Sequence, residues 1–580
     1  MEKDSLKIVI IGGVAAGTSA AVKARRKSEN AEIIIYEKYK YISYGTCGLP
    51  YYVSGRIKDI ESLVINTVSM FQKRFNIAVN ILHEVLAVNP GSRTIKVKDL
   101  RTGREFQDSY DKLIIATGSS RIILDPGLNA ASNSFELVTQ DDAVKLKEYL
   151  RHLSAHRKVT AGNRSDLAVP DTEHTEAVLQ NAVIAGGGYI GLELVEAFLS
   201  NGLKVSIIEK MSQILPVFDF EIIEYLENYL TERGIRILKN QQIKSFEKNA
   251  GGEVVTIFTT DGTEISCNLL FLSAGTKPEV RIALECGITT GNSGAIIVDE
   301  YMRTNKPDIF AAGDCCECRD FVSGQRRAYN LASIANIQGR CAGYNAAGGN
   351  ERFTDSIPTS VIKVLDVAVA KTGISFSLAK QSGINAAKVE FHALNHAGYY
   401  PGASMMHMMV IYDRNSGTIL GFEAIGKEGV DKKTDIMSVA IRSRMKLWEL
   451  TALNLCYHPE YGSAKDPVNI LGMIGENIRR QENIFIDTEQ LRQWIGKGEG
   501  LIILDVRTRR EYDTGHIEGA INIPLDDLRD NLGILDRKKK IVVYCRTSYR
   551  SYLAFRILKN NGFENLWNLN GSYLSWIRKL

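Results

Sequence analysis

Two stretches of the chain repeat one order of apolar and polar positions. Each begins with a β-branched apolar run, passes through a glycine turn into a helix, and ends in a second apolar run that closes on a carboxylate. The first is "LKIVIIGGVAAGTSAAVKARR" followed by "EIIIYEK", and the second is "NAVIAGGGYIGLELVEAFLSNG" followed by "KVSIIEK". Strand, glycine turn, helix, strand and acid in this order predict a βαβ unit that binds a dinucleotide.

The pattern changes along the rest of the chain. Residues 253–276 and 355–475 alternate short strands with turns, and the second stretch adds a helical segment at 432–447 but no glycine loop. Residues 151–180 are polar and lack periodicity, which predicts a surface linker or insertion. The composition becomes polar near 481–487 and an α/β pattern then starts afresh, which predicts a separate C-terminal domain.

We therefore expect an α/β protein with two Rossmann-like nucleotide-binding domains, an α+β domain and a C-terminal α/β domain. A length of 580 residues agrees with this number, because one hydrophobic core does not grow so large. The expected boundaries are 1–150 and 301–354 for the two parts of the first nucleotide-binding domain, 151–181 for the linker, 182–300 for the second nucleotide-binding domain, 355–475 for the α+β domain and 484–580 for the C-terminal domain.

Composition and charge argue against several classes of protein. The formal net charge of +4 gives no basis for nucleic-acid binding. Nine cysteines are too sparse for a disulfide scaffold and suggest a reducing compartment. The N-terminus lacks the pattern of a signal peptide, and no run approaches the roughly 20 apolar residues of a membrane span. We expect a soluble, cytoplasmic protein without a membrane partner.

The glycines of the first unit depart at one position from the usual G-x-G-x-x-G. Gly12, Gly13 and Gly17 form the turn, but Val14 stands where a second motif glycine is usual. Glu37, about 20 residues further on, supports the prediction because a carboxylate there can accept hydrogen bonds from ribose hydroxyls. The helix after the turn would hold a pyrophosphate through its free N–H groups. The alternative is a glycine turn in another kind of α/β domain.

The second unit matches the motif at each glycine. Gly186, Gly188 and Gly191 form its turn, and Glu209 ends its second strand. An acid at this place repels a 2′-phosphate, so we expect NADH to be preferred over NADPH. Lys210, the next residue, keeps NADPH open as an alternative.

Two further segments extend the pattern. "YDKLIIATGSS" is a strand that ends in Ala-Thr-Gly, and "PDIFAAGDC" is a strand that ends in Gly313 and Asp314. With these segments, residues 5–475 resemble the pyridine nucleotide-disulfide oxidoreductase family. The resemblance implies FAD at the first unit, a nicotinamide nucleotide at the second, and contact of Asp314 with the ribityl chain. The implied cofactor residues are Gly12, Gly13, Val14, Ala15, Gly17, Glu37, Ala116, Thr117, Gly118, Asp314, Gly186, Gly188, Ile190, Gly191 and Glu209.

One cysteine stands alone after the first unit. In "YISYGTCGLPYY" it is Cys47, and Tyr52 occupies the position where dithiol members of that family carry a second cysteine. A single thiol can store two electrons as a sulfenate, a persulfide or a mixed disulfide with a ligand. The alternative is a buried, inert thiol. The small neighbours Thr46 and Gly48 pack a core poorly, which favours a redox role.

Three segments resemble one branch of this family more closely than the others. "SYGTCGLPYYVSG", "NHAGYYPGA" and "CYHPEYGSAKDPVNILG" resemble the coenzyme A-disulfide reductase branch, which includes persulfide and polysulfide reductases. The resemblance implies a homodimer in which 355–475 is the dimerisation domain, with Tyr399 and Tyr457 approaching the redox sulfur of the partner subunit. It also implies a set of coenzyme A contacts. These are Ser19, Lys23, Arg26, Ser43, Thr46 and Lys465, with an ordinary solvated basic face as the alternative for Lys23 and Arg26.

The C-terminal segment has its own nucleophile. In "KIVVYCRTSYRSYLAFRIL" a buried strand ends in Cys545, and a short loop runs directly into a helix. Backbone N–H groups of such a loop point at the sulfur, and the helix N-terminus lowers the pKa of a thiol. Arg546 and Arg550 add positive charge. With "LIILDVRTRREYDTGHIEGAINIP", residues 484–580 resemble a rhodanese domain, which implies that Cys545 carries sulfane sulfur; Ser548 replaces a common glycine of the loop.

The cluster Cys315, Cys316 and Cys318 raises the question of a metal. A zinc site needs about four ligands, usually from two separated pairs. Cys341 is the nearest other cysteine, and no suitably spaced histidine pair accompanies the cluster. We expect packing or surface thiols and no metal.

These observations lead to one main hypothesis and two alternatives. The main hypothesis is a reductase that passes electrons from NADH through FAD to Cys47, with coenzyme A disulfide, coenzyme A persulfide or polysulfide as substrate, coupled to sulfur transfer at Cys545. The first alternative is an NADH oxidase or peroxidase that cycles Cys47 through a sulfenate. The second is a sulfur-carrier or sensing protein in which the flavin half gates Cys545.

Overall fold

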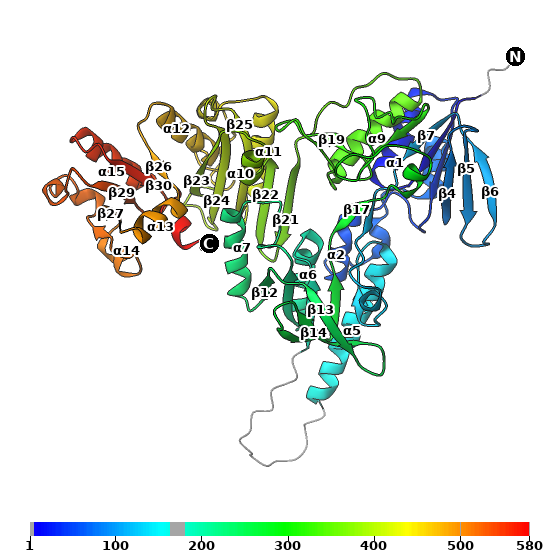
Figure 1. The fold of residues 1–580 in the computed structure, drawn as a ribbon, viewed down its shortest axis with the longest axis horizontal. Coiled ribbons are helices and arrows are strands. Elements are labelled where there is room, and N and C mark those ends of the chain that lie inside the picture. The colour runs from blue at the N-terminus through cyan, green and yellow to red at the C-terminus, as the bar shows by residue number, and fades with distance from the viewer. Residues whose placement is uncertain (1–4, 163–179, 499, 579–580) are drawn as a thin grey trace, which may run out of the picture. The chain divides into compact units, whose positions relative to one another are not determined.

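The computed structural model describes residues 5–162, 180–498 and 500–578 in two compact units. The first unit comprises Met1–Ile214 and Ile235–Pro358, and the second comprises Leu215–Gly234 and Thr359–Leu580. Figure 1 labels many of the elements and colours the chain from blue at the N-terminus to red at the C-terminus. Each unit is described by itself below.

The first unit contains a parallel sheet at the chain's N-terminal βαβ unit. Its order is β18-β7-β1-β2-β3. Helix α1 lies against helix α9, and a Cβ on Gly339 would stand 2.2 Å from the carbonyl oxygen of Ala16, so the two helices approach backbone to backbone. The bounds are β1 Lys7–Ile11, β2 Glu32–Glu37, β3 Ala78–Ile81, β7 Lys112–Ile115, β18 Ile309–Ala311, α1 Ala15–Lys27 and α9 Ala332–Ala346.

A second parallel sheet of the same unit follows the order β12-β11-β10-β16-β9. The inner strands β10 and β16 are almost entirely buried because helices cover a parallel sheet, which explains their continuous apolar runs. The bounds are β9 Ser134–Phe135, β10 Asn181–Ala185, β11 Lys204–Glu209, β12 Arg236–Lys239, β16 Leu269–Leu272, α5 Gln140–Gly162 and α6 Tyr189–Ser200.

Smaller elements complete this unit. They connect or cover the two sheets and include the short helix that contains Cys47 and the one that follows it. The bounds are η1 Thr46–Gly48, α2 Leu49–Val53, η2 Ile60–Leu63, α3 Val68–Phe75, β4 His83–Asn89, β5 Thr94–Asp99, β6 Glu105–Ser109, β8 Ser119–Arg121, α4 Pro126–Asn129, β13 Ile243–Lys248, β14 Val254–Thr259, β15 Glu264–Ser266, β17 Thr276–Pro278, α8 Arg281–Glu285, β19 Cys318–Arg319 and β20 Arg326–Arg327.

The predicted linker at 151–181 needs a correction at its start. Helix α5 continues to Gly162, so 151–162 is helical. The segment lacks proline and glycine up to that residue, and nothing in it ends a helix. Residues 163–179 lie outside the described residues.

The second unit contains a five-stranded antiparallel sheet of order β21-β22-β25-β24-β23. All eight residues of β25 are buried, and helix α11 packs on the sheet. The bounds are β21 Thr359–Val364, β22 Val367–Gly373, β23 Ala386–Leu394, β24 Met405–Asp413, β25 Ile419–Gly426, α10 Phe376–Gln381, α11 Val430–Arg442, η3 Leu447–Ala452 and α12 Pro467–Arg479.

The C-terminal domain of this unit has a parallel sheet of order β26-β30-β29-β27-β28. Helix α15 begins shortly after β29, as the sequence predicts for the loop at Cys545. The bounds are β26 Phe485–Ile486, β27 Leu501–Asp505, β28 Ile521–Asn522, β29 Lys540–Tyr544, β30 Leu566–Leu569, α13 Thr488–Gly496, α14 Arg509–Asp513, η4 Leu525–Asp527, η5 Leu532–Ile534, α15 Tyr549–Asn560 and α16 Ser572–Ile577.

Helix α7, Phe220–Thr231, belongs to the second unit although the chain places it between β11 and β12. Its N-cap residue Asp219 explains why. The backbone N–H of Asp219 donates to Glu423 on β25 at 2.8 Å, and its carboxylate accepts from the backbone N–H of Ser377 at 3.0 Å. Burial raises the pKa of Glu423 to about 8. These long-range contacts are invisible in the local sequence pattern.

The C-terminal domain docks on α7 and on β23 of the antiparallel sheet. The hydroxyl of Tyr225 donates to the carbonyl oxygen of Leu574 and lies 2.9 Å from Nε2 of His392. Asn570 accepts from the backbone N–H of Glu390 at 2.9 Å. Arg578 forms an ion pair with Glu224 on α7 at 2.5 Å. One buried hydroxyl therefore joins three parts of the unit.

Removal of the Tyr225 hydroxyl tests this docking. Tyr225→Phe leaves the buried Nε2 of His392 without its partner and removes one of two donors to the carbonyl oxygen of Leu574, which costs about 1–3 kcal/mol. We expect the amides of α16 to exchange hydrogen faster by a corresponding factor, measured by native-state exchange with mass spectrometry. Tyr229→Phe is the matched control, because the Tyr229 hydroxyl is buried without a hydrogen-bond partner in the described part of the chain. Equal exchange in the two variants would contradict the assignment.

Candidate functional site

The glycine turn of the first unit packs directly on the end of β7. Gly12 has a φ of +105°, and a Cβ there would lie 2.2 Å from the carbonyl oxygen of Ala116. A Cβ on Gly17 would lie 1.9 Å from the carbonyl oxygen of Gly12. No side chain fits at either position, so the backbone is left free to approach a ligand at the helix N-terminus.

The second βαβ unit, which belongs to the same compact unit, repeats this geometry. Gly186 has a φ of +111°, and a Cβ there would lie 2.1 Å from the carbonyl oxygen of Ser273. Val14 corresponds to Gly188, where a Cβ would meet nothing within 4 Å. Both residues cap their helices with negative φ, −105° and −82°. The departure at Val14 is therefore tolerated without strain.

The two predicted carboxylates accept hydrogen bonds from the backbone of these turns. Glu37 accepts from the backbone N–H of Gly13 and of Tyr39, at 2.7 and 2.8 Å. Glu209 accepts from Gly187 and from Met211, both at 2.7 Å. Burial raises the pKa of Glu37. Each carboxylate oxygen has a second lone pair for a ribose hydroxyl. The sequence did not predict that Glu37 and Glu209 would also stabilise the glycine turns.

The surroundings of Asp314 test whether the residues present fit a flavin cofactor. It follows β18, and burial raises the pKa of its carboxyl to about 6. Within the described ranges, no hydrogen bond or ion pair satisfies this carboxylate. A ligand with hydroxyl donors fits such a group, as the ribityl chain of FAD does. Nearby, Thr117 donates to the carbonyl oxygen of Glu279 at 2.6 Å and Gly118 has a φ of +70°. The residues present fit FAD.

Cys47 is exposed, unlike the inert thiol of the alternative interpretation. It lies in η1, which runs directly into α2. The loop before it is tied to the glycine turn, because the backbone N–H of Ser43 donates to the carbonyl oxygen of Gly13 at 2.8 Å. Ser43 has a φ of +51° and is buried, whereas Thr46 is exposed. The loop of Cys47 is therefore hydrogen-bonded to the turn that the sequence assigns to FAD.

The three residues predicted on α1 have different surroundings. Ser19 donates to Asn336 at 2.6 Å. Lys23 lies 3.7 Å from the carboxylate of Glu351, and its ammonium lies over the ring of Tyr344. Arg26 is exposed. Arg26 is thus more available than Lys23 to a phosphate ligand.

In the second unit, the two predicted tyrosines lie together. The hydroxyl oxygens of Tyr399 and Tyr457 are 2.8 Å apart, and both side chains are exposed. Their hydrogen bond raises the pKa of Tyr457. Lys465, also exposed, lies just before α12. The pair presents phenol groups at the surface of this unit.

Cys545 is enclosed by its loop. The thiol is 1% exposed, and the backbone N–H of Ser548 donates to Sγ at 3.2 Å. The guanidinium of Arg550 donates twice to Glu511, both at 2.7 Å, and holds the pKa of that carboxyl at about 2. Arg546 is exposed. Arg550 therefore supports the loop through Glu511, and Arg546 is the arginine open to a ligand.

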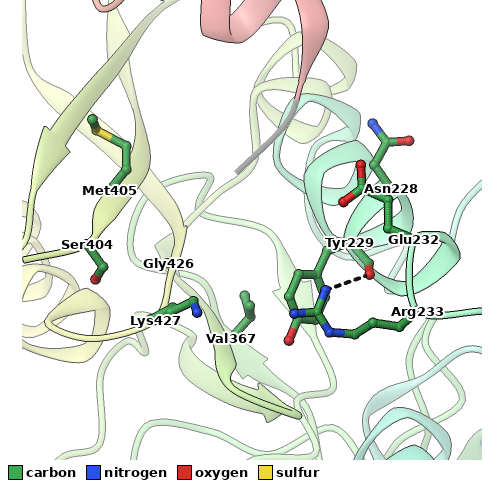
Figure 2. A pocket seen from close by; sticks show the side chains of 9 residues that line it. All are labelled: Asn228, Tyr229, Glu232, Arg233, Val367, Ser404, Met405, Gly426 and Lys427. Carbon is green, nitrogen blue, oxygen red and sulfur yellow. Dashed lines mark hydrogen bonds between the residues drawn. The ribbon is translucent and has the colours of Figure 1, made fainter. Parts of the chain in front are cut away.

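The remaining cysteines and the cavity lie apart from these residues. Cys315, Cys316 and Cys318 are buried, which corrects the surface alternative, and burial raises their pKa values. The described residues hold no group of three or more potential metal ligands. Figure 2 shows a cavity of about 250 Å³ in the second unit, where Arg233 lies over the ring of Tyr229. No predicted site residue lines it. No described helix is long and apolar enough to cross a membrane.

Two hydrogen-bonded glycine turns, a half-buried carboxylate without a described partner and an exposed thiol beside the first turn define a flavin-dependent oxidoreductase that takes electrons from a nicotinamide nucleotide. The model of the pyridine nucleotide-disulphide oxidoreductase family matches residues 6–339. The dimerisation domain of that family matches 359–466, and a rhodanese-like domain matches 487–579. The chain belongs to the pyridine nucleotide-disulphide oxidoreductase family and carries a rhodanese-like domain.

Individual relatives agree with this assignment. The reduced CoADR-RHD of Bacillus anthracis is 33% identical, with a TM-score of 0.91 over 100% of this chain and 99% of its own. An NAD-dependent persulfide reductase from A. fulgidus is 32% identical, with a TM-score of 0.87 over 98% and 100%. A coenzyme A disulfide reductase of Staphylococcus haemolyticus and an NADH oxidase of Methanocaldococcus jannaschii are each 28% identical over 80% of this chain, and over 98% and 97% of their own. The predicted family and fold class are confirmed.

The loop at Cys545 gives a test of local strain. Ser548 has a φ of +87°, and its hydroxyl is buried without a partner among the described residues. We expect Ser548→Gly to stabilise the loop by about 1 kcal/mol, because glycine adopts this backbone freely. The measurement is hydrogen exchange of the α15 amides.

The matched control is a substitution that we expect to destabilise the same region. Ser551 lies inside α15 and donates to the carbonyl oxygen of Ser548 at 3.0 Å. Ser551→Gly removes this bond and adds backbone freedom, so we expect α15 to lose about 1 kcal/mol of protection. Faster exchange in Ser548→Gly than in the parent protein would refute the strain argument.

Proposed function

We propose that the protein is a homodimeric reductase of coenzyme A disulfide, coenzyme A persulfide or polysulfide, coupled to sulfur transfer at Cys545. The observation that carries the proposal is the exposed Cys47, whose loop is hydrogen-bonded through Ser43 to the glycine turn of the first unit. A thiol so placed is open to a sulfur substrate on one side and joined to the flavin turn on the other. The names of the relatives agree with the substrate class.

The proposed cofactor residues belong to two groups, one at each βαβ unit. Gly12, Gly13, Gly17, Glu37 and Asp314 would hold FAD, with Val14, Ala15, Ala116, Thr117 and Gly118 around it. Gly186, Gly188, Ile190, Gly191 and Glu209 would hold the nicotinamide nucleotide. The carboxylate of Glu209 disfavours a 2′-phosphate, so the proposal includes a preference for NADH. When bound, FAD supplies two-electron transfer from the nicotinamide to sulfur.

Cys47 performs the sulfur chemistry in this proposal. Its thiolate attacks the S–S bond of the substrate, forms a new bond to one sulfur and releases the other as a thiolate or sulfide. Two electrons, which bound FAD would supply, then break the new S–S bond, restore the Cys47 thiolate and release the second sulfur as a thiolate or sulfide. Tyr399 and Tyr457, offered by the partner subunit, donate a proton to the departing sulfur. Ser19, Lys23, Arg26, Ser43, Thr46 and Lys465 hold coenzyme A.

The rhodanese-like domain handles sulfane sulfur. The Cys545 thiolate accepts a sulfur atom from a donor and carries it as a persulfide, while the N–H of Ser548 and the nearby helix N-terminus stabilise the charge on sulfur. Arg546 attracts the anionic donor, and Arg550 fixes the loop through Glu511. The persulfide is then a substrate of the class that Cys47 reduces.

A second candidate is an NADH oxidase, since one relative bears that name. In that case Cys47 would cycle through a sulfenate, with oxygen as the acceptor of electrons. The exposed tyrosine pair and the added rhodanese-like domain have no role in such a reaction, which favours the sulfur reductase.

Single replacements of the two thiols separate the functions. We expect Cys47→Ser to reduce NADH-dependent turnover of coenzyme A disulfide and polysulfide to background while sulfur transfer from thiosulfate to cyanide persists. Cys545→Ser should show the opposite result. Steady-state rates with each substrate provide the measurement. Rapid NADH-dependent oxygen consumption without any sulfur substrate would favour the oxidase instead.

Mass spectrometry of the protein purified without reductant tests the ligand. We expect a coenzyme A adduct on Cys47, because an exposed thiol beside a coenzyme A site is oxidised to a mixed disulfide. The Cys47→Ser variant is the control. An adduct on Cys456, the other exposed cysteine, would argue against a specific site.

A further inference from the structure

The first turn of helix α16 is hydrogen-bonded to the loop that carries Cys545. The backbone N–H of Tyr573 donates to the carbonyl oxygen of Cys545 at 3.0 Å. The backbone N–H of Leu574 donates to the carbonyl oxygen of the next loop residue, Arg546, at 3.2 Å. The N–H of Cys545 itself donates to Oγ of Ser572 at 3.2 Å. Hydrogen bonds on both sides of the thiol therefore connect its backbone to one short helix.

The same helix is also fixed to α7. The buried hydroxyl of Tyr225 donates to the carbonyl oxygen of Leu574 at 2.9 Å. At the end of α16, the carbonyl oxygen of Arg578 accepts from the side-chain amide of Asn228 at 2.8 Å. Leu574 thus uses its N–H to hold the loop of Cys545 and its carbonyl oxygen to bind α7.

The segment that leads into α16 is anchored as well. The buried side chain of Asn570 accepts from the backbone N–H of Glu390 at 2.9 Å and donates to the carbonyl oxygen of Lys388 at 3.2 Å. Both partners lie on β23. The amide of Asn570 also donates to Asp487 at 2.9 Å. Because residues 570–578 are held before the helix, within it and at its end, α16 is a fixed support for the loop that it contacts.

We propose that Tyr225 is a positioning residue for Cys545. Through α16 it keeps the loop in the arrangement in which the sulfur accepts a hydrogen bond from the backbone N–H of Ser548, at 3.2 Å. The inference rests on the proposed role of Cys545 as the thiol that carries sulfane sulfur. It adds that this thiol depends on α7, which the chain places between β11 and β12. Leu574 follows Tyr225 by 349 residues, so no sequence motif connects the two.

The dependence follows from the short reach of an N–H···S hydrogen bond, which weakens when its donor is displaced or turned. In sulfur transfer the Cys545 thiolate attacks the outer sulfur of thiosulfate, the S–S bond breaks, and sulfite leaves with the bonding electrons. The persulfide then gives its outer sulfur to cyanide, which restores the thiolate. A displaced loop slows this chemistry. The side chain of Arg546 is exposed, so its attraction for the donor anion is retained.

The test is the transfer of sulfur from thiosulfate to cyanide by the full-length, FAD-loaded protein. Tyr225→Phe keeps the aromatic ring but releases the carbonyl oxygen of Leu574 from α7. We expect kcat to fall about fivefold while the KM for thiosulfate stays within about twofold of the parent value, because the chemistry is slowed and donor binding is retained. Rates are measured well below the unfolding temperature of each variant, so that loss of folded protein does not lower kcat.

Two controls separate positioning from stability. Tyr229→Phe removes a hydroxyl from the same helix, and that hydroxyl has no hydrogen-bond partner among the described residues. Leu558→Val shortens a buried side chain near the end of α15, away from the loop of Cys545 at the start of that helix. We expect both variants to keep the kcat of the parent protein. An unchanged kcat in Tyr225→Phe, or an equal fall in Leu558→Val, overturns the inference.

Alkylation of Cys545 gives a measurement that does not depend on the proposed function. The thiol is buried, so iodoacetamide reaches it only when the loop opens. We expect Tyr225→Phe to be alkylated about threefold faster than the parent protein at pH 8, measured by mass spectrometry of the Cys545 peptide, and Tyr229→Phe to match the parent. Equal rates in all three proteins overturn the inference. A parent protein that transfers no sulfur refutes the proposed role of Cys545 and leaves this comparison intact.

Discussion

The carbonyl oxygen of Ala116 presses against Gly12 so closely that a Cβ would lie 2.2 Å away, and the rest of the first unit is arranged around this contact. It fixes the glycine turn on the end of β7, and Glu37 holds the turn from the other side through Gly13. The same turn accepts a hydrogen bond from Ser43 and so places the loop of Cys47. One backbone contact thereby links the glycine turn to the position of the Cys47 loop.

The second βαβ unit has the same arrangement of glycine turn, carbonyl oxygen and carboxylate. Ser273 takes the place of Ala116, and Glu209 takes the place of Glu37. A buried carboxylate that accepts two backbone N–H groups is costly to remove, because both donors would lose their partner. The acid at the end of the second strand therefore stabilises the glycine turn even when no ribose is bound.

The parts of the fold that the sequence predicted are those with a local cause. The glycine turns, the acids that follow them and the strand, loop and helix at Cys545 each depend on a few neighbouring residues. Helix α7 was missed as a part of the second unit, because Asp219 is held there by Glu423, about 200 residues away. The contacts of Tyr225 were missed for the same reason, since its partners lie on a distant strand and in the C-terminal domain.

Cys47 and Cys545 differ in exposure in the way that their proposed tasks require. Cys47 is exposed, as a thiol must be if its partner sulfur arrives on a large ligand. Cys545 is 1% exposed and receives a backbone N–H donor, which suits a small sulfur atom held as a charged persulfide. A chain that reduced only bulky disulfides would gain nothing from the enclosed thiol. The presence of both points to a reaction in which single sulfur atoms are carried as well as reduced.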